Sequence, residues 1–482
     1  MSASPTLASE PRASSTPSST TRTRLLFVVL ILLLAFGVRG LTRQFMQAHL
    51  DDPGWFQSGT YALFDRSAQN ILDGKASIFW IDDPAETDGA IYPPGYPAWL
   101  ALVYTVTGER SAAATQRLQW ILDALAVLLV IGIGVTAFQW SVGLMAGLFA
   151  AFSPLLSLAG TTPLADAPTS WLVVGGSWML LLAYQRRSLG WAIVAGLMLG
   201  ASCWLRINGL LLGFFWAGAI VLLFGIPKRT RLKLAGGVLV GVIVLVTPLI
   251  VRNAVAFRAF VPAGLGMGTN LWEGIGETDR AREFGAVFGD QALIEEERRE
   301  MGVAPDAKFN LYYPDGVRRD RERARRAMSV IVRNPIWYAG VMLHRMWGML
   351  KVAGEPLPYY GSAGINVTST KTLPEGKRGG VLSLVVNVLG MVQSISRYVL
   401  LPLAVFGIAV GFRSDWRITL LMLATVVYYL GPGTFAHTEL RYVLPMHCVL
   451  GVFAGVGVTF VWKRFSRRSP GEKTGELKGV SV

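Results

Sequence analysis

Acidic residues in the first polar loop could act as a general base. The loop spans residues 42–117, and its first half contains Asp51, Asp52, Asp65 and Asp73. A carboxylate can take a proton from a hydroxyl group and so make the hydroxyl a better nucleophile. A single acidic side chain in a polar loop is usually only solvated, so the loop supplies candidates without by itself identifying a base.

Basic residues at the ends of apolar segments could hold an anion. Arg206, Arg252 and Arg441 follow or precede such segments, and Asp166 lies in a short turn between two of them. An arginine at the end of a membrane span commonly reaches toward lipid headgroups. Arg206 is harder to explain in this way, because apolar residues flank it and burial of an arginine costs roughly 2.5–3.5 kcal/mol. We therefore expect Arg206 to have an anionic partner or to face a cavity.

Acids and cations at one membrane interface suit the transfer of a sugar from a lipid phosphate. The phosphate leaves as a stable anion, so it needs cations to hold it and no general acid. The acceptor hydroxyl is a poor nucleophile and needs one carboxylate as its base. Direct displacement by that hydroxyl inverts the configuration of the anomeric carbon.

The composition is that of an integral membrane protein. Of the 482 residues, 52% are hydrophobic and 16% are charged, against about 25% charged residues in soluble proteins. The net charge of +14 does not indicate nucleic-acid binding, because much of the basic excess lies in short loops beside apolar segments, where it sets membrane topology. Cys203 and Cys448 lie in apolar segments, and the four histidines have no ligand spacing, so we assign no metal ligands.

About ten apolar segments approach the ~20 residues that a membrane-crossing helix needs. They cover residues 25–41, 118–138, 142–158, 169–184, 188–205, 208–226, 232–251, 388–412, 417–435 and 441–462. A cleaved signal peptide is the alternative for the first segment. Lysines and arginines fill alternate short loops, which predicts that both termini are cytoplasmic. Loops 42–117 and 252–387 are then external, and the acidic and basic candidates lie near the external interface.

This topology divides the chain into five parts. They are a disordered cytoplasmic tail at residues 1–24, a transmembrane core at 25–251 that includes the loop 42–117, an external region at 252–387, C-terminal transmembrane helices at 388–462 and a basic cytoplasmic tail at 463–482. In the external region, the charged stretch 295–332 and the amphipathic run 335–350 predict helices on the membrane face. Asp123, inside the second apolar segment, either faces a cavity or is satisfied by a neighbouring helix.

Short motifs along the chain give a family resemblance. An A-x-x-I-L-x-G segment begins at Ala68, a PPGYP turn covers residues 93–97, and an L-R-x-x-G-L run begins at Leu205. An R-N pair at Arg252 and Asn253 is followed by F-V-P and then by G-x-N-L-W, which contains Asn270. An R-Y pair, Arg441 and Tyr442, precedes the last apolar segment. In their order and topology these motifs resemble the GT-C superfamily of polyprenyl-phosphate-sugar-dependent glycosyltransferases over about residues 25–462, and in particular protein O-mannosyltransferases and lipid A aminoarabinose transferases.

The resemblance implies an all-α polytopic membrane protein, a GT-C-type bundle of about ten or more transmembrane helices with external interfacial helices. It implies a glycosyltransferase of the cell (plasma or inner) membrane whose active site is external and whose partners are the bilayer, a polyprenyl-phosphate sugar and an extracytoplasmic protein, lipid or glycan acceptor. No cofactor is certain, and a divalent cation remains possible. Nucleic acid is not a partner.

The resemblance also implies roles for the candidate residues. An acidic residue of the first loop is the base, Asp166 shapes the site, and external arginines hold the lipid phosphate. The substrate-binding candidates are Asp166, Arg206, Arg252, Asn253, Asn270, Arg441 and Tyr442. In the family the acidic pair usually lies nearer the A-x-x-L-L-x-G segment than Asp51 and Asp52 do here. Asp65 lies closer to that segment and is therefore an alternative, while Asp52 remains the first choice for the base and Asp51 the second.

A membrane transporter or flippase of a lipid-linked or anionic substrate is the alternative function. Transporters place ionisable groups and broken helices near the middle of the bilayer. Most charged residues here lie near the external ends of the apolar segments, which favours an enzyme.

Overall fold

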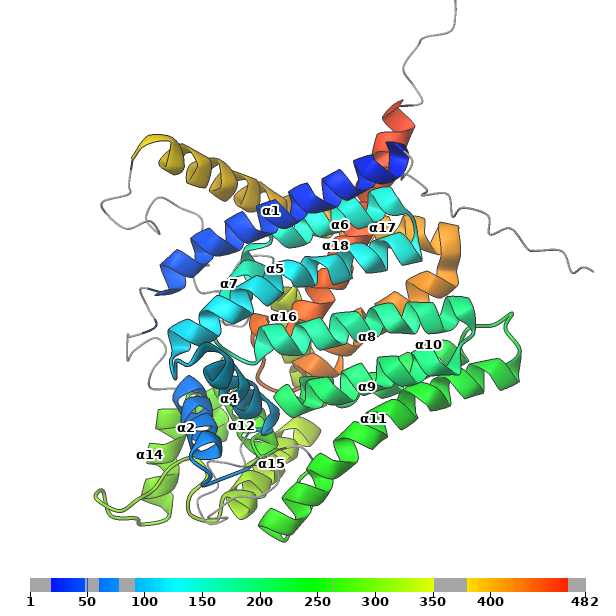
Figure 1. Cartoon of the computed structure of the whole chain (residues 1–482). Helices are drawn as coiled ribbons and strands as arrows, with labels where there is room; N and C mark the ends of the chain where they lie inside the picture. The colour runs from blue at the N-terminus through cyan, green and yellow to red at the C-terminus, as the bar shows by residue number, and fades with distance from the viewer. Residues whose placement is uncertain are drawn as a thin grey trace, which may run out of the picture.

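The computed structural model describes residues 19–47, 50, 60–77, 92–262, 264–350 and 379–466. Within these ranges the regular elements are all helices (Figure 1). The expected all-α membrane fold is therefore confirmed.

Five helices are long and apolar enough to cross a membrane. They are α1 (Ser19–Gln47), α5 (Ala112–Ala137), α11 (Lys228–Phe257), the part of α17 (Gly380–Leu430) that begins at Tyr398, and α18 (Leu444–Ser466). Helices α6 (Trp140–Phe152) and α7 (Pro154–Thr161) meet at a bend of 60°, and they add a sixth candidate span if this bent pair is counted as one. The expected count of about ten spans is not confirmed. The predicted spans in the middle of the chain correspond to shorter or less apolar helices, namely α8 (Asp166–Arg186), α9 (Leu189–Leu205) and α10 (Leu212–Val221).

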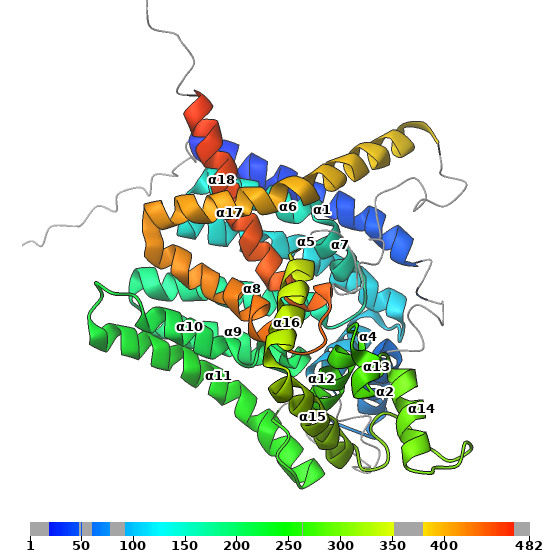
Figure 2. The same ribbon diagram turned by 180° about the vertical axis from the view of Figure 1, so that it is seen from behind.

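Helix α17 turns back on itself at Asp415, whose backbone leaves the helical region with φ −150° and ψ 97°. Figure 2 shows its two limbs on either side of this turn. The Asp415 carboxylate accepts hydrogen bonds from the backbone N–H groups of Arg417 (2.9 Å) and Ile418 (3.2 Å). It therefore caps the start of the second limb in the usual manner of an aspartate before a helix.

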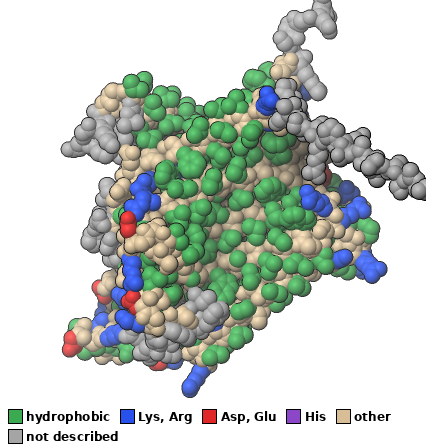
Figure 3. Space-filling model, viewed as in Figure 1, with side chains coloured by type: hydrophobic (Ala, Val, Ile, Leu, Met, Phe, Trp, Pro, Cys, Tyr) green, Lys and Arg blue, Asp and Glu red, His purple; other side chains and the backbone are tan. Residues whose placement is uncertain are grey.

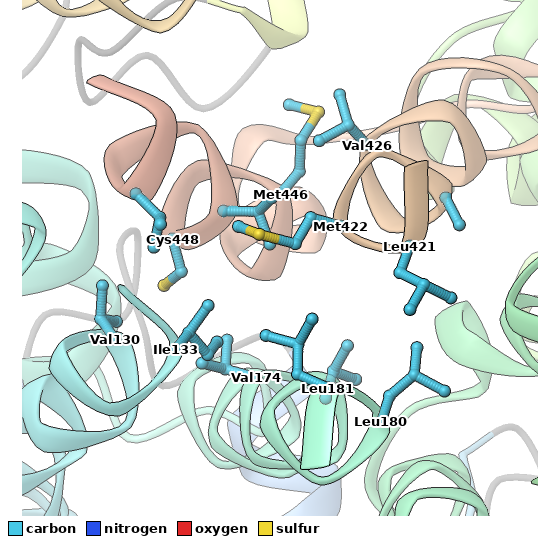
Figure 4. Packing of buried hydrophobic residues seen from close by; sticks show 14 of the residues in the cluster. Val130, Ile133, Val174, Leu180, Leu181, Leu421, Met422, Val426, Met446 and Cys448 are labelled. Carbon is cyan, nitrogen blue, oxygen red and sulfur yellow. The ribbon is translucent and has the colours of Figure 1, made fainter. Parts of the chain in front are cut away.

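The apolar core surrounds α18, the most buried of the five candidate spans. Figure 4 shows side chains of α5 and α8 packed toward residues of α17 and α18, such as Met422 and Met446. Small residues bring other helices close together: a Cβ atom on Gly196 of α9 would overlap the backbone of Val238 in α11. Close approach through small residues is a common way to pack helices in membranes.

A buried ion pair ties α1 to α5. Arg39 Nε lies 2.6 Å from Asp123 Oδ2, and both side chains are almost fully buried. The guanidinium also donates to the carbonyl oxygens of Ala150 and Ala151, and Trp171 Nε1 donates to Asp123 Oδ1 at 2.6 Å. A charge pair away from water is stable only when its remaining polar atoms are also bonded. Asp123 is thus satisfied by neighbouring helices, which decides between the two possibilities that its sequence position left open.

A second group of helices covers one end of the bundle (Figures 1 and 2). It consists of α2 (Thr60–Leu72), α4 (Gly95–Thr107), α12 (Met267–Gly276), α13 (Ala281–Phe284), α14 (Asp290–Glu300), α15 (Gly316–Arg333) and α16 (Pro335–Met349). Basic residues lie at the other end of the bundle, in the turn between α8 and α9, at the start of α11 and at the end of α18. In Figure 3 a broad apolar surface separates two charged ends. We call the end with α2, α4 and α12–α16 the capped end.

Candidate functional site

The turn that carries Asp166 is fixed by two glutamines of α5. Gln116 Nε2 donates to the carbonyl of Thr161 at 3.0 Å, and Gln119 Nε2 donates to the carbonyl of Thr162 at 2.7 Å. Both glutamines are fully buried. Buried polar groups usually have hydrogen-bond partners, and these two bonds hold the segment that leads into α8 against α5. Asp166, the first residue of α8, is thereby held at the capped end of the bundle.

Arg206 meets Asp166 because α9 ends one residue earlier. Arg206 has an extended backbone, with φ −151° and ψ 141°, so its side chain leaves the helix surface. Its Nε lies 3.1 Å from Asp166 Oδ1, and its guanidinium lies 4.7 Å from the centre of the Tyr442 ring. Both members of the pair are buried. The expectation that Arg206 has an anionic partner is confirmed.

A short 3-10 helix, η6 (Leu440–Val443), brings a second charge pair to the same place. Arg441 Nη2 donates to Glu439 Oε1 at 2.5 Å, and the Tyr442 hydroxyl donates to the same oxygen at 3.1 Å. Burial opposes ionisation of Glu439, but the nearby cations, Arg441 first, hold the pKa of this carboxyl below its usual value. Sequence analysis did not select Glu439, although its position two residues before Arg441 was a usable signal. We call Asp166, Arg206, Glu439, Arg441 and Tyr442 the charged cluster.

The charged cluster keeps unused hydrogen-bonding capacity. Both oxygens of Asp166 and the Nε atoms of Arg206 and Arg441 are buried without a directional hydrogen bond to any described residue. Asp166 and Arg206 are therefore held together by charge at a distance suited to an ion pair, rather than by an aligned hydrogen bond. Buried polar atoms without partners are costly and are often functional.

Arg252 lies on α11 and is also buried. Its Nη1 donates to Asn253 Oδ1 at 2.8 Å, and Asn253 Nδ2 donates to the carbonyl of Val261 at 3.1 Å. Among the described residues, Arg252 forms no salt bridge, and its Nε has no hydrogen-bond partner. A buried guanidinium held only by a neutral amide can bind an added anion with little competition.

Asp65 is the one base candidate whose surroundings the structure describes. Its Oδ1 accepts a hydrogen bond from the Tyr104 hydroxyl at 2.5 Å, and its Oδ2 accepts one from Gln69 at 2.8 Å. Burial, and then the bond to Asp65, raise the pKa of Tyr104. Both carboxylate oxygens are thus engaged in joining α2 to α4. Asp51 and Asp52 lie outside the described residues.

Asn270 connects α12 to the segment that leads into the charged cluster. Its carbonyl accepts a hydrogen bond from the backbone N–H of His437 at 2.8 Å. Beside it, Glu277 accepts from Arg345 Nε at 2.9 Å and lies 3.0 Å from His437 Nδ1. Burial opposes protonation of His437, but Glu277 outweighs it and raises the pKa of the imidazole. Sequence analysis missed this group, because its members lie far apart along the chain.

Among the described residues no three acidic, histidine or cysteine side chains are arranged to hold a metal ion.

Comparisons with known proteins give three results. A family model described as dolichyl-phosphate-mannose-protein mannosyltransferase matches residues 92–251, which include Asp166 and Arg206. No curated protein sequence matches the chain. Among solved structures, the archaeal oligosaccharyltransferase AglB from Archaeoglobus fulgidus, in complex with an inhibitory peptide and a dolichol-phosphate, is 14% identical with a TM-score of 0.51. That alignment covers 94% of this chain and 53% of AglB.

A second structure of the Archaeoglobus fulgidus enzyme, tethered to an acceptor peptide, is 12% identical with a TM-score of 0.51 and covers 92% of this chain and 50% of that one. ArnT from Cupriavidus metallidurans, bound to undecaprenyl phosphate, is 14% identical over 93% of this chain and 79% of ArnT, with a TM-score of 0.37. The chain thus spans about half the length of the oligosaccharyltransferase and shares its fold.

Proposed function

We propose that this chain is a membrane glycosyltransferase of the GT-C type, which transfers a sugar from a polyprenyl-phosphate carrier to an extracytoplasmic acceptor. The acceptor is a protein, a lipid or a glycan, and the anomeric carbon is inverted. The archaeal oligosaccharyltransferase with the same fold was solved with a dolichol-phosphate, which is a carrier of this chemical class.

The observation that carries the proposal is the presence of buried arginines with unused donors at the ends of apolar helices. Arg206 ends α9 and Arg252 lies in the last turns of α11. Bonds between a guanidinium and a phosphate are short, strong and often bidentate. A donor phosphate in contact with these side chains would supply the acceptors that their buried N–H groups lack among the described residues.

In the proposed reaction, the carboxylate of Asp52 takes the proton of the acceptor hydroxyl. The hydroxyl oxygen bonds to the anomeric carbon while the bond from that carbon to the phosphate oxygen breaks. The electron pair of that bond leaves with the polyprenyl phosphate, and the arginines stabilise the charge. Leu50, which directly precedes Asp51, packs in the same apolar cluster as Ala165, which directly precedes Asp166. We propose the base in the two residues that follow Leu50 in the sequence because Leu50 shares this cluster with the residue before Asp166.

Asp65 is a weaker candidate for the base than Asp52. A base needs a free lone pair within hydrogen-bonding distance of the acceptor hydroxyl, and each bond that a carboxylate already accepts leaves it fewer. The two oxygens of Asp65 already accept bonds from Tyr104 and Gln69. We propose that Asp65 positions α2 against α4 and so supports the loop that contains Asp51 and Asp52.

The proposed orientation places the capped end outside the cell membrane and both termini in the cytoplasm. Basic residues at the opposite end, such as Arg186, Lys228 and Lys463, belong to short connections or to helix ends. Such residues are enriched on the cytoplasmic side of membrane proteins. The charged cluster and Arg252 are then at the external side, where a lipid-linked sugar and its acceptor would meet.

The transporter alternative gains no support from the buried ion pair between α1 and α5. A transport site needs charged groups that can exchange partners during the cycle. Arg39 and Asp123 are instead fully engaged by each other, by Trp171 and by two backbone carbonyls. Their contacts are those of a structural pair.

The base is tested by neutralising each acidic candidate without changing its size. General base catalysis is worth about 10²–10⁴-fold, so Asp52→Asn should lower turnover by that factor and leave donor binding nearly unchanged. Asp51→Asn and Asp65→Asn are matched controls in the same assay. Loss of turnover in Asp51→Asn alone would move the base by one residue, whereas full activity of all three variants would rule out a base in this loop.

A further inference from the structure

A basic cavity lies between the end of α11 and the start of α15. Its volume is about 760 Å³. Phe257, the last residue of α11, and Arg258, which follows it, line the cavity on one side, and Arg318, Arg321 and Arg325 line it from α15. None of these residues belongs to the charged cluster or to the donor contacts proposed above.

The cavity has an uncompensated positive charge. Asp315 is its one acidic lining residue among the described residues, and its Oδ2 lies 3.3 Å from Arg318 Nη2. Arg321 donates only to the backbone carbonyl of Phe260, at 3.3 Å. Among described residues, Arg258 and Arg325 form no ion pair. The cavity is therefore lined by four guanidinium groups and one carboxylate, and this excess of positive charge favours the binding of an anion.

The spacing of the arginines directs them to one side of α15. Arg318, Arg321 and Arg325 follow one another at intervals of three and four residues. Residues at these intervals share one face of a helix. Arginines gathered in this way repel one another unless an anion lies between them, because like charges at such spacings are destabilising.

If α11 crosses the membrane, its length puts the cavity at the depth of lipid headgroups. Helix α11 has 30 residues and is therefore about 45 Å long, whereas the hydrocarbon core of a bilayer is about 30 Å thick. The basic start of α11, from Lys228 to Lys233, belongs at one surface of the membrane, so the far end of the helix, at Phe257, reaches the opposite surface. Val255 and Phe260, on either side of Arg258, are 75% and 69% exposed. Apolar side chains exposed beside a membrane-crossing helix suit contact with lipid chains.

We propose that this cavity binds the phosphate group of an anionic phospholipid at the membrane surface. The arginines would hold the headgroup, while the exposed apolar residues beside Arg258 would contact the acyl chains. Such a lipid would bridge α11, which crosses the membrane, and α15, which belongs to the capped end. It would therefore fix the helices of the capped end against the membrane.

This site is separate from the proposed donor site. Arg252 lies six residues before Arg258 on the same helix, but Arg252 is buried and bonded to Asn253, whereas Arg258 is exposed. The lipid site can therefore fail without loss of donor binding, and the two proposals can be tested independently.

The test measures lipid binding to the purified full chain in detergent by native mass spectrometry. The ligands are phosphatidylglycerol, phosphatidylcholine, inorganic phosphate and a polyprenyl phosphate. The variant is Arg321→Gln with Arg325→Gln, and the control is Arg333→Gln, an exposed arginine of the same helix outside the cavity. Loss of two charge-assisted bonds should weaken phosphatidylglycerol binding about tenfold or more, whereas the control should bind as the unchanged chain does.

Three results would overturn the lipid site. The first is equal loss of phosphatidylglycerol binding in the control, which would indicate unspecific attraction to positive charge. The second is inorganic phosphate or phosphatidylcholine binding as tightly as phosphatidylglycerol. The third is loss of polyprenyl-phosphate binding in the double variant, which would make this cavity part of the donor site. Because Arg325 has no hydrogen bond within the described chain, Arg325→Gln alone replaces the double variant if the latter does not fold.

Discussion

Arg206 has two separable roles in this account, one in the stability of the fold and one in donor binding. Its side chain and that of Asp166 are 10% and 3% exposed, and their charged atoms lie 3.1 Å apart. Arg206→Gln leaves a buried carboxylate without its nearest cation, a change that costs about 3–5 kcal/mol of unfolding free energy. Arg441 also attracts Asp166, so we expect a value near the lower limit.

The double substitution Arg206→Gln with Asp166→Asn removes both charges, keeps the size of the side chain at position 166 and shortens the one at position 206. Replacement of a buried ion pair by neutral groups is often nearly neutral for stability. The double variant should therefore regain most of the stability lost in Arg206→Gln. Donor affinity should not recover, because a bond to a charged group is worth about 1.5–3 kcal/mol, which corresponds to a roughly 10- to 150-fold weaker dissociation constant.

Thermal unfolding in detergent measures the stability, and binding of a polyprenyl phosphate measures the donor contact. Asp166→Asn alone completes the cycle, since it keeps Arg206 and its contact with the Tyr442 ring. Recovery of donor affinity together with stability in the double variant would show that Arg206 acts only on the fold. Unchanged donor affinity in Arg206→Gln would refute its contact with the phosphate.

Two further predictions concern the fold. In Gly160→Ala, the new methyl group would overlap the Asp123 carboxylate, which Arg39 holds in place. Thermal melts should show that this substitution lowers the free energy of unfolding by about 1–3 kcal/mol. The control is Gly218→Ala, where nothing lies within 4 Å of the new methyl group and the free energy of unfolding should not change in this way. Glu277 raises the pKa of His437, so protonated His437 stabilises the folded state. This stabilisation is complete when the pH is below the ordinary pKa of histidine, about 6.5, and it is lost as the pH rises through the raised pKa of His437. The melting temperature should fall over that range, and a slope that persists in His437→Gln would contradict this assignment.

The sequence was sufficient to predict the fold class and the end of the bundle at which charged residues gather. The basic loops predict which ends of the apolar segments share a side, so Asp166, Arg206, Arg441 and Tyr442 were expected at one depth. The structure brings these four residues together. Their actual pairing depends on where helices end, as with the extended backbone at Arg206, and hydropathy carries little information on such ends.

Other features depend on contacts that a single sequence does not display. The group of Glu277, Arg345 and His437 joins residues separated by 68 and 160 positions, and no local pattern indicates such pairs. The same holds for Arg39 and Asp123, which are 84 positions apart. The number of spans was harder to predict for a different reason, because an apolar helix packed among others, such as α10, has the composition of a span without its length.

We propose that the chain uses a polyprenyl-phosphate sugar as its glycosyl donor. The most direct measurement reconstitutes the purified chain in lipid vesicles with a polyprenyl-phosphate sugar carrying a labelled sugar and with an acceptor extract from cell envelopes. We expect labelled product and free polyprenyl phosphate to appear in equal amounts, and Arg252→Gln to slow their formation. Movement of the labelled lipid across the vesicle membrane with no glycosylated product would contradict the claim and identify a transporter instead.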